Sequence, residues 1–202
     1  MEEILSSDYS SKKSLNSTEN LINLKPKKEQ FNEKSFSKII SELLTDICEE
    51  GKSNIDSKLA LIKPFISKKI PSISLTDYIE RLLKYSKAFK EIIIIILIYL
   101  DTICAKHKIN LNYYNIHKLI FAAFIVAIKF HEDEYYSFNY YAKLGGISKK
   151  EAINLEYEFL SLIDFKLFVN QQLYDKYYNY LSNLKDEEDE DIYDDESEGD
   201  IN

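Results

Sequence analysis

The sequence contains no tryptophan, and only 4 glycines and 3 prolines occur among its 202 residues. Because glycine and proline form many of the turns in proteins, a fold of many short strands would need more of them. Their scarcity therefore favours helices. Hydrophobic residues make up 45% of the chain, which is typical of a globular protein. The length is sufficient for one domain with a buried core and flanking segments.

The 2 cysteines, Cys48 and Cys104, are too far apart to form a metal-binding motif. We interpret them as buried free thiols in a reducing compartment. The first residues, MEEILSSDYSSKK, lack the basic and apolar regions of a signal peptide. The apolar run at residues 92–100 is half as long as the roughly twenty residues that a membrane helix needs. We therefore expect an intracellular protein, nuclear or cytoplasmic, that has no contact with a membrane.

The formal net charge of −8 comes from the C-terminal segment. Residues 186–200 contain 11 acidic residues and no lysine or arginine, whereas the rest of the chain contains 26 basic and 23 acidic residues. This nearly neutral body lacks the basic surface that nucleic-acid binding needs, so we expect no nucleic-acid partner. We interpret the acidic segment as a solubilising, disordered end. Autoinhibition and recruitment of a basic substrate are the alternatives.

The spacing of apolar residues divides the chain into five segments. An amphipathic stripe over residues 33–50 predicts one helix, and a weaker pattern over 57–63 predicts another. The densest apolar pattern begins shortly afterwards. The predicted segments are a flexible N-terminal arm (1–33), N-terminal helices (34–70), a compact helical module (71–169), a C-terminal helix (170–184) and an acidic disordered tail (185–202).

The compact module contains the signals of five helices. Ser74 and Ser148 each stand three positions before an acidic residue, which is typical of a helix N-terminal cap. Gly145 and Gly146 indicate a helix end. The second and third helices are apolar on nearly every side, so other helices must enclose them. The predicted helices begin near residues 75, 89, 115, 138 and 148, and they form an all-α bundle.

No arrangement of residues in the sequence indicates catalysis. The chain has no glycine-rich phosphate loop, nucleophile elbow or Cys/His pair. His107 and His117 have no obvious nucleophile or acid as a partner. The cluster at residues 131–134, His-Glu-Asp-Glu, is better explained as a solvated turn than as a metal site. We therefore expect no catalytic residues, no metal, no cofactor and no small-molecule substrate.

Four charged residues stand inside apolar helical patterns and need an explanation. Arg81 and Asp101 would each be costly to bury alone, so we predict a structural ion pair between them. Lys129 and Glu156 allow two interpretations with equal weight. They could lock two helices together, or they could hydrogen-bond the backbone of a partner protein inside a hydrophobic ring that excludes water.

The sequence motifs that contain these charged residues resemble those of a cyclin box. The resemblance begins with FISKKIPSISLTDYIERLLKYSKAF and LIYLDTI. It continues through Asn-x-His, Ala-x-Lys-Phe, Asn before Tyr-Ala-Lys, Gly-Gly-Ile and Leu-Glu, in the order and spacing of the family. The sequence is most similar to the phosphate-signalling cyclins, also called P-type or U-type. The resemblance covers about residues 39–181, and the strongest motifs lie between residues 65 and 169.

The resemblance implies a five-helix cyclin box with additional flanking N- and C-terminal helices, and a cyclin-dependent protein kinase as partner in a heterodimer. Lys129 and Glu156 match the charged pair that contacts the kinase near its αC helix. Arg81 and Asp101 match an internal salt bridge. The positions that supply surrounding apolar contacts to the kinase are occupied by Phe130, Leu160, Phe165 and Leu167.

By the same resemblance, the protein would be a regulatory subunit that binds and activates the kinase, whereas all catalytic residues belong to the kinase. A cyclin-fold scaffold and a transcription-factor-like binding module, neither of which activates a kinase, are the alternatives. The sequence departs from the family pattern at five positions, none of them assigned to kinase contact. These are Thr102, His131, Glu132, Ala152 and Ile153.

Overall fold

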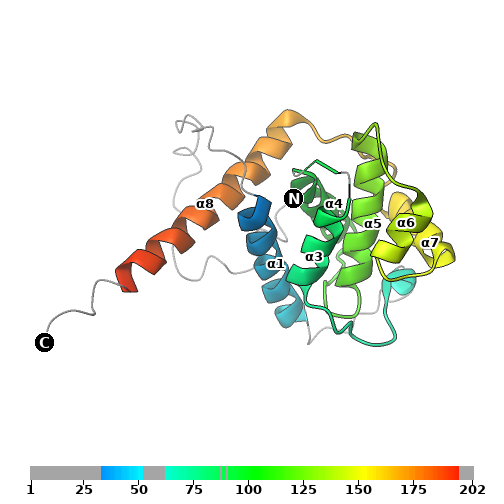
Figure 1. Ribbon diagram of the computed structural model, residues 1–202, viewed down its shortest axis with the longest axis horizontal. Helices are drawn as coiled ribbons and strands as arrows, with labels where there is room; N and C mark the ends of the chain where they lie inside the picture. The colour runs from blue at the N-terminus through cyan, green and yellow to red at the C-terminus, as the bar shows by residue number, and fades with distance from the viewer. Residues whose placement is uncertain (1–32, 52–61, 87, 90, 196–202) are drawn as a thin grey trace, which may run out of the picture.

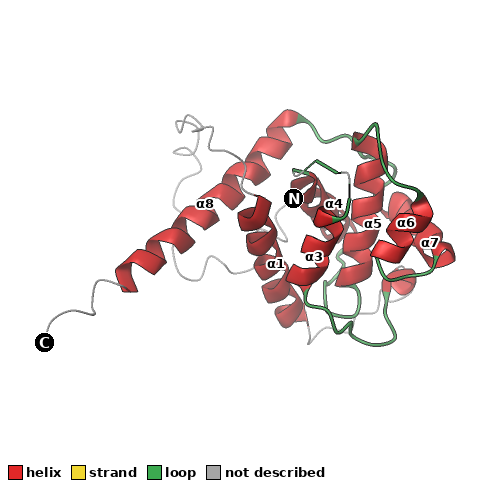
Figure 2. Cartoon of the chain, viewed as in Figure 1, coloured by secondary structure: helices red, strands yellow, loops and turns green. Residues whose placement is uncertain are grey.

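The computed structural model describes residues 33–51, 62–86, 88–89 and 91–195. Every regular element among these residues is a helix, which confirms the predicted all-α fold (Figure 2). The arm at 1–32 and most of the weak helix at 57–63 lie outside the described residues. The α-helices are α1 (Glu33–Glu50), α3 (Leu75–Lys84), α4 (Ile92–His107), α5 (Ile116–His131), α6 (Phe138–Leu144), α7 (Lys149–Leu162) and α8 (Gln171–Asp195), and a 3-10 turn, η4, covers Lys63–Phe65.

Two apolar helices form the centre of the bundle. Helix α5 packs against α4 on one side and against α7 on another, as Figure 1 shows. All residues from Ile92 to Asp101 in α4 are buried, as predicted for a helix that is apolar on every side. In α5, Ala122, Ala123 and Ala127 are fully buried. Their small side chains let the neighbouring helices approach closely.

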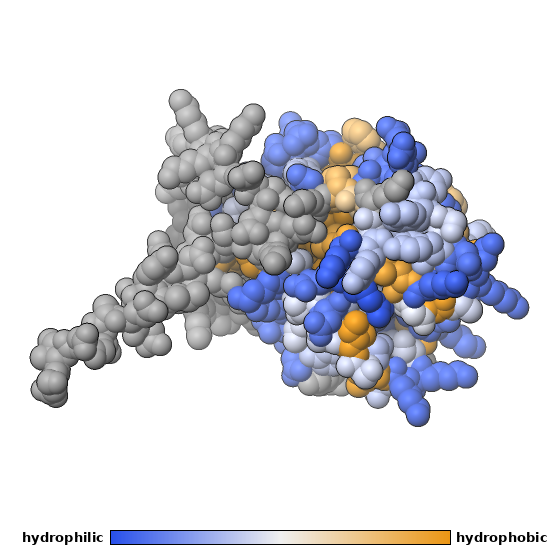
Figure 3. Space-filling model, viewed as in Figure 1, coloured by the Kyte–Doolittle hydropathy of each residue, from blue (hydrophilic) through white to orange (hydrophobic). Residues whose placement is uncertain are grey.

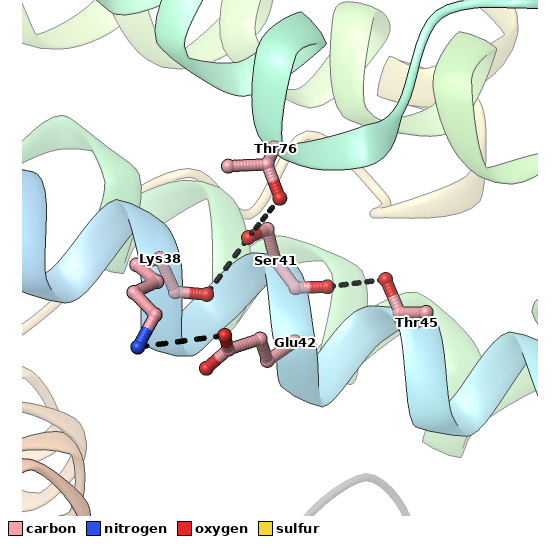
Figure 4. A network of polar contacts seen from close by, with 5 residues as sticks. All are labelled: Lys38, Ser41, Glu42, Thr45 and Thr76. Carbon is pink, nitrogen blue, oxygen red and sulfur yellow. Dashed lines mark hydrogen bonds and ion pairs between the residues drawn. The ribbon is translucent and has the colours of Figure 1, made fainter. Parts of the chain in front are cut away.

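The flanking helix α1 belongs to the same body as the bundle. It packs against α3 and α8 through the predicted apolar stripe, which includes the buried Ile40 and Leu44. The buried hydroxyl of Ser41 donates to the Lys38 carbonyl (2.7 Å) and lies 2.8 Å from the Thr76 hydroxyl in α3 (Figure 4). Because a buried hydroxyl without partners is costly, these bonds fix the position of α1 against the start of α3.

The caps of α3 and α7 are as the sequence predicts. The Ser74 side chain accepts from the Asp77 N–H (3.0 Å), and the Ser148 side chain accepts from the Glu151 N–H (3.1 Å). Each bond satisfies one of the N–H groups that a helix start leaves without a partner. Helix α4 begins at Ile92 and not near residue 89, and the side chain of its N-cap residue, Glu91, makes no capping hydrogen bond.

Helix α8 is longer than predicted. The sequence places its end at residue 184 and an acidic disordered tail beyond it, but the structure continues the helix to Asp195 (Figure 1). Residues 185–195 contain no glycine and no proline, so no residue in this stretch interrupts the helical backbone. The prediction of a tail from residue 185 is corrected accordingly. Residues 196–202 lie outside the described part of the chain.

Gly145 and Gly146 end α6 for different physical reasons. Gly146 has a φ of 72°, a left-handed conformation that glycine adopts without strain. Gly145 has an ordinary helical φ of −71°. A Cβ atom added to Gly145 would lie 2.4 Å from ring carbons of Phe121, whose side chain is in the core. Position 146 requires glycine for its backbone conformation, and position 145 requires glycine for packing.

We expect Gly145→Ala to lower the free energy of unfolding by about 2–3 kcal/mol, because Phe121 cannot move away without disturbing the core. Gly146→Ala should cost about 1–2 kcal/mol through backbone strain. Urea unfolding of both variants, followed by circular dichroism, measures the two effects. Equal stability of Gly145→Ala and the original chain would contradict the packing assigned to Gly145.

His117 in α5 is buried beside α3. Its Nε2 atom lies 3.1 Å from the Ile73 carbonyl oxygen, and its ring is 5.1 Å from that of Tyr78. Burial lowers the pKa of His117 below its ordinary value of 6.5, and the positive charge of Arg81 lowers it further, although the Ile73 carbonyl opposes the shift. The folded protein therefore favours the neutral form of His117 more strongly than the unfolded chain does.

This environment predicts that the protein loses stability as the pH falls from about 7.5 to about 5.5. The unfolded chain takes up a proton at the ordinary pKa of 6.5, whereas the folded chain resists protonation of His117. Acidification therefore favours unfolding. Thermal unfolding of the original chain and of His117→Gln across this range should show a shallower pH dependence in the variant. An unchanged slope would show that other groups, such as His131, are responsible.

Candidate functional site

Lys129 and Glu156 form a direct ion pair between α5 and α7. The Lys129 Nζ and Glu156 Oε1 atoms are 2.5 Å apart, and the two side chains are 37% and 17% exposed. The Lys129 Nζ also lies 5.2 Å from the ring centroid of Phe138. The structure thus brings together Lys129 and Glu156, for which the sequence allowed either a lock between two helices or a contact with a partner protein. Because both remain accessible to solvent, the link between the helices does not prevent contact with a partner.

The four predicted apolar contact residues lie at the end of α5, in α7 and in the loop after α7, and each is at least partly exposed. Phe130 and Phe165 are 50% and 64% exposed. Leu160 and Leu167 are half-buried and pack against the core. We call the surface formed by Lys129, Glu156 and these four residues the α5–α7 face. Figure 3 shows one side of the molecule, where hydrophobic residues lie at the surface among hydrophilic ones.

A polar contact attaches the loop after α7 to the end of α5. The Tyr99 hydroxyl in α4 donates to the Leu167 carbonyl (2.6 Å) and lies 3.1 Å from His131 Nε2. The His131 ring is in edge contact with Phe130, with centroids 4.9 Å apart. These contacts connect the loop at Leu167 to the last turn of α5, at His131.

The same loop contains two consecutive left-handed residues. Asp164 has a φ of 55° and Phe165 a φ of 56°. A left-handed conformation costs about 1–2 kcal/mol for most residues other than glycine, so the surroundings must hold it in place. The Phe165 N–H donates to the Leu160 carbonyl (3.0 Å), and the Asp164 carboxylate pairs with Lys106 at 2.6 Å. This lysine lowers the pKa of Asp164. The strained backbone directs the Phe165 side chain into solvent.

A groove of about 350 Å³ adjoins the ion pair. Its lining includes residues that the sequence did not indicate, because the α5–α6 loop has no periodic pattern. Exposed aromatic residues on or near the α5–α7 face were also missed, namely Tyr157 and Phe168, which are 64% and 80% exposed. The groove is lined by Ile125, Lys129, Tyr135, Tyr136, Phe138, Tyr141, Lys149, Ile153 and Glu156.

The cluster at residues 131–134 is only partly the solvated turn that the sequence predicted. Asp133 and Glu134 are exposed, but His131 bonds to Tyr99, and Glu132 accepts from the Phe89 N–H at 2.5 Å. Glu132 thereby connects this turn to the segment before α4. Within the part of the chain that the structure describes, no group of His, Cys, Asp or Glu residues is placed to hold a metal ion.

The predicted ion pair between Arg81 and Asp101 is not formed among the described residues. Asp101 is 1% exposed and accepts a short hydrogen bond from the Tyr177 hydroxyl in α8. Arg81 lies over the ring of Tyr78 and beside Gly146. The sequence could not reveal the competing partner, because Tyr177 is 76 residues from Asp101 in the chain. The core acid is thus satisfied without the arginine.

The sequence model of the cyclin family matches residues 6–167. The chain belongs to the cyclin family. Its all-helical structure is that of a cyclin box with flanking helices, as the resemblance implied. No helix in the described part of this cyclin has the length and apolar character needed to cross a membrane.

Three curated relatives show which kind of cyclin the chain resembles. PHO85 cyclin-7 of Saccharomyces cerevisiae is 35% identical over 150 residues, which cover 68% of this chain and 53% of the relative. Cyclin-U2-1 of Arabidopsis thaliana is 33% identical over 114 residues, with 56% and 51% covered. The PHO85 cyclin-like protein psl1 of Schizosaccharomyces pombe is 40% identical over 108 residues, with 52% and 44% covered. This cyclin spans about half the length of these relatives, and its similarity to phosphate-signalling cyclins is confirmed.

Proposed function

We propose that this cyclin is a regulatory subunit that binds and activates a cyclin-dependent protein kinase. Its cyclin box, at residues 71–169, docks through the α5–α7 face on the αC helix and activation loop of the kinase. The observation that carries this proposal is the exposure of Phe130 and Phe165 around the Lys129–Glu156 pair. Large apolar side chains at a surface, with charged groups at their edge, are typical of protein interfaces.

The ion pair has hydrogen-bonding capacity left for a partner backbone. Only the Oε1 atom of Glu156 contacts Lys129 among the described residues, so Oε2 can accept from a kinase N–H. The Lys129 ammonium has three N–H groups and can donate to a kinase carbonyl. Apolar side chains around the pair would exclude water and strengthen these bonds.

Binding at this face would activate the kinase by positioning its αC helix. In protein kinases an αC glutamate must pair with the lysine that orients ATP, and the activation loop must be ordered. A rigid docking surface favours the αC position and the loop conformation in which this pair forms. All chemical steps are then performed by the kinase.

The proposal is tested by mixing the purified chain with candidate cyclin-dependent kinases. Two relatives have PHO85 in their names, so a Pho85-type kinase is the first candidate. Co-elution in size-exclusion chromatography together with stimulated phosphorylation of a peptide substrate supports the proposal. Co-elution without stimulation indicates a scaffold. Salt-sensitive binding of nucleic acid without kinase binding indicates the transcription-factor-like alternative.

A further inference from the structure

Arg81 in α3 is a half-buried cation whose charge no acidic group among the described residues neutralises. It makes no hydrogen bond or ion pair with any described residue, and its Nε atom is enclosed and without an acceptor. The guanidinium carbon lies 5.1 Å from the ring centroid of Tyr78. A stacked ring orients the guanidinium but provides no hydrogen-bond acceptor for its five N–H groups. A charge in this position is costly unless an acceptor joins it.

The guanidinium lies in a seam between α3 and the turn after α6. Two hydrogen bonds define this seam, from the Tyr78 hydroxyl to the Gly145 carbonyl (3.4 Å) and from the Tyr140 hydroxyl to the Tyr85 carbonyl (2.8 Å). Arg81 is on α3 between these two contacts. Its Nη2 atom is 3.8 Å from the point where a side chain at position 146 would begin.

Gly146 leaves this end of the guanidinium accessible. The residue is exposed, and its φ of 72° disfavours any residue that has a side chain. An external group can therefore approach the Nη atoms over the glycine backbone. The Tyr78 ring and the enclosure of Nε restrict the orientation of the guanidinium.

The charges around the seam favour an anion. Lys84 is exposed one helical turn after Arg81, and Lys143 is exposed in the last turn of α6. Asp77, one turn before Arg81, is engaged with Ser74. Its carboxylate accepts from the Ser74 hydroxyl (2.7 Å), and its backbone N–H donates to the same hydroxyl oxygen. Glu80 is adjacent in sequence, and neighbouring residues on a helix do not face each other.

We propose that Arg81 is an oxyanion-binding residue, which takes a carboxylate or phosphate group of a partner protein in the seam between α3 and the α6–α7 turn. A guanidinium binds both groups through two parallel N–H···O bonds, which a lysine cannot make. This site uses no residue of the α5–α7 face, and it does not depend on kinase binding. It would let this cyclin select acidic or phosphorylated segments of the proteins that it recruits.

The test is a titration of the ¹⁵N-labelled chain with inorganic phosphate and, separately, with acetate at constant ionic strength. Saturable NMR shifts of the Arg81 Nε–H and the Gly146 N–H are expected, with Kd on the order of 1–10 mM for such a single contact. A preference for phosphate points to phosphorylated segments, and equal affinity points to acidic ones.

Matched variants separate this site from general attraction to lysines. Arg81→Gln should abolish the saturable shift at Gly146. Arg81→Lys should lower the affinity several-fold, because lysine cannot make the two parallel N–H···O bonds of a guanidinium. Lys150→Gln, which removes an exposed charge elsewhere, should leave it unchanged. Shifts without saturation up to about 50 mM, several times the expected Kd, would overturn the proposal, as would an undiminished shift in Arg81→Gln.

Discussion

Replacing both members of the Lys129–Glu156 pair by alanine should lower the affinity for the kinase by about 100-fold or more, a loss of about 2.7 kcal/mol in binding free energy. The fold should remain intact. The pair is partly exposed, and exposed ion pairs contribute only about 0–1 kcal/mol to stability. At an interface the same charges lose their contact with water, and truncation of such a group costs about 2–5 kcal/mol.

A second ion pair on the same two helices provides a matched control. Lys118 of α5 and Glu151 of α7 are 2.8 Å apart, with exposures of 19% and 38%. Lys118 lies in the first turn of α5, at the opposite end from Lys129, and Glu151 lies in the first turn of α7, so neither belongs to the α5–α7 face. Lys118→Ala with Glu151→Ala removes the same charges between the same helices, so it should leave kinase affinity within about threefold of the original value.

The measurement is a titration of the kinase with each double variant, together with circular dichroism and thermal unfolding. Loss of binding in the first variant alone, with both variants folded, would establish the α5–α7 face as the contact. Unfolding of the first variant would show that its pair is a structural lock. Equal affinities of the two variants would remove the pair from the interface.

Local sequence signals predicted the helices because the interactions that cause them are local. Ser148 caps α7 through a residue three positions away, and Gly146 ends α6 by its own backbone freedom. The burial of α4 follows from its composition alone. The end of α8 was missed because the acidic composition after residue 184 suggested disorder, whereas no residue there breaks a helix.

Contacts between distant segments were harder to predict. The residue pattern singled out Lys129 and Glu156 but left a helix lock and a partner contact equally open, and the resemblance to cyclins favoured the contact, which stays a prediction. The pattern also predicted a pairing of Arg81 with Asp101, with which the resemblance agreed, and the described structure does not contain that pair. Neither residue pattern nor resemblance indicated that Tyr177 would reach Asp101 or that Tyr99 would hold the loop at Leu167. Such choices depend on three-dimensional packing of helices and not on sequence periodicity.

The largest change in stability is expected when Asp101, the buried partner of Tyr177, is replaced. We expect Asp101→Ala to lower the free energy of unfolding by about 2–4 kcal/mol, because it leaves a cavity and a buried Tyr177 hydroxyl without its acceptor. Tyr177→Phe should cost about 1–3 kcal/mol, because it removes a donor from a buried carboxylate. Arg81→Met should change stability by less than about 0.5 kcal/mol, since methionine retains the apolar stem and Arg81 makes no hydrogen bond or ion pair with a described residue.

Double-mutant cycles from urea unfolding test Tyr177 and Arg81 separately as partners of Asp101. Asp101 and Tyr177 should show a coupling energy of about 1–2 kcal/mol, as expected for groups in direct contact, and Asp101 and Arg81 should show less than about 0.5 kcal/mol. A large coupling with Arg81 and none with Tyr177 would restore the ion pair that the sequence predicted. It would also remove the basis of the anion site, because an arginine already paired in the core has no charge to offer at the surface. The coupling energy between Asp101 and Arg81 thus decides whether Arg81 stabilises the fold or is available to bind a partner.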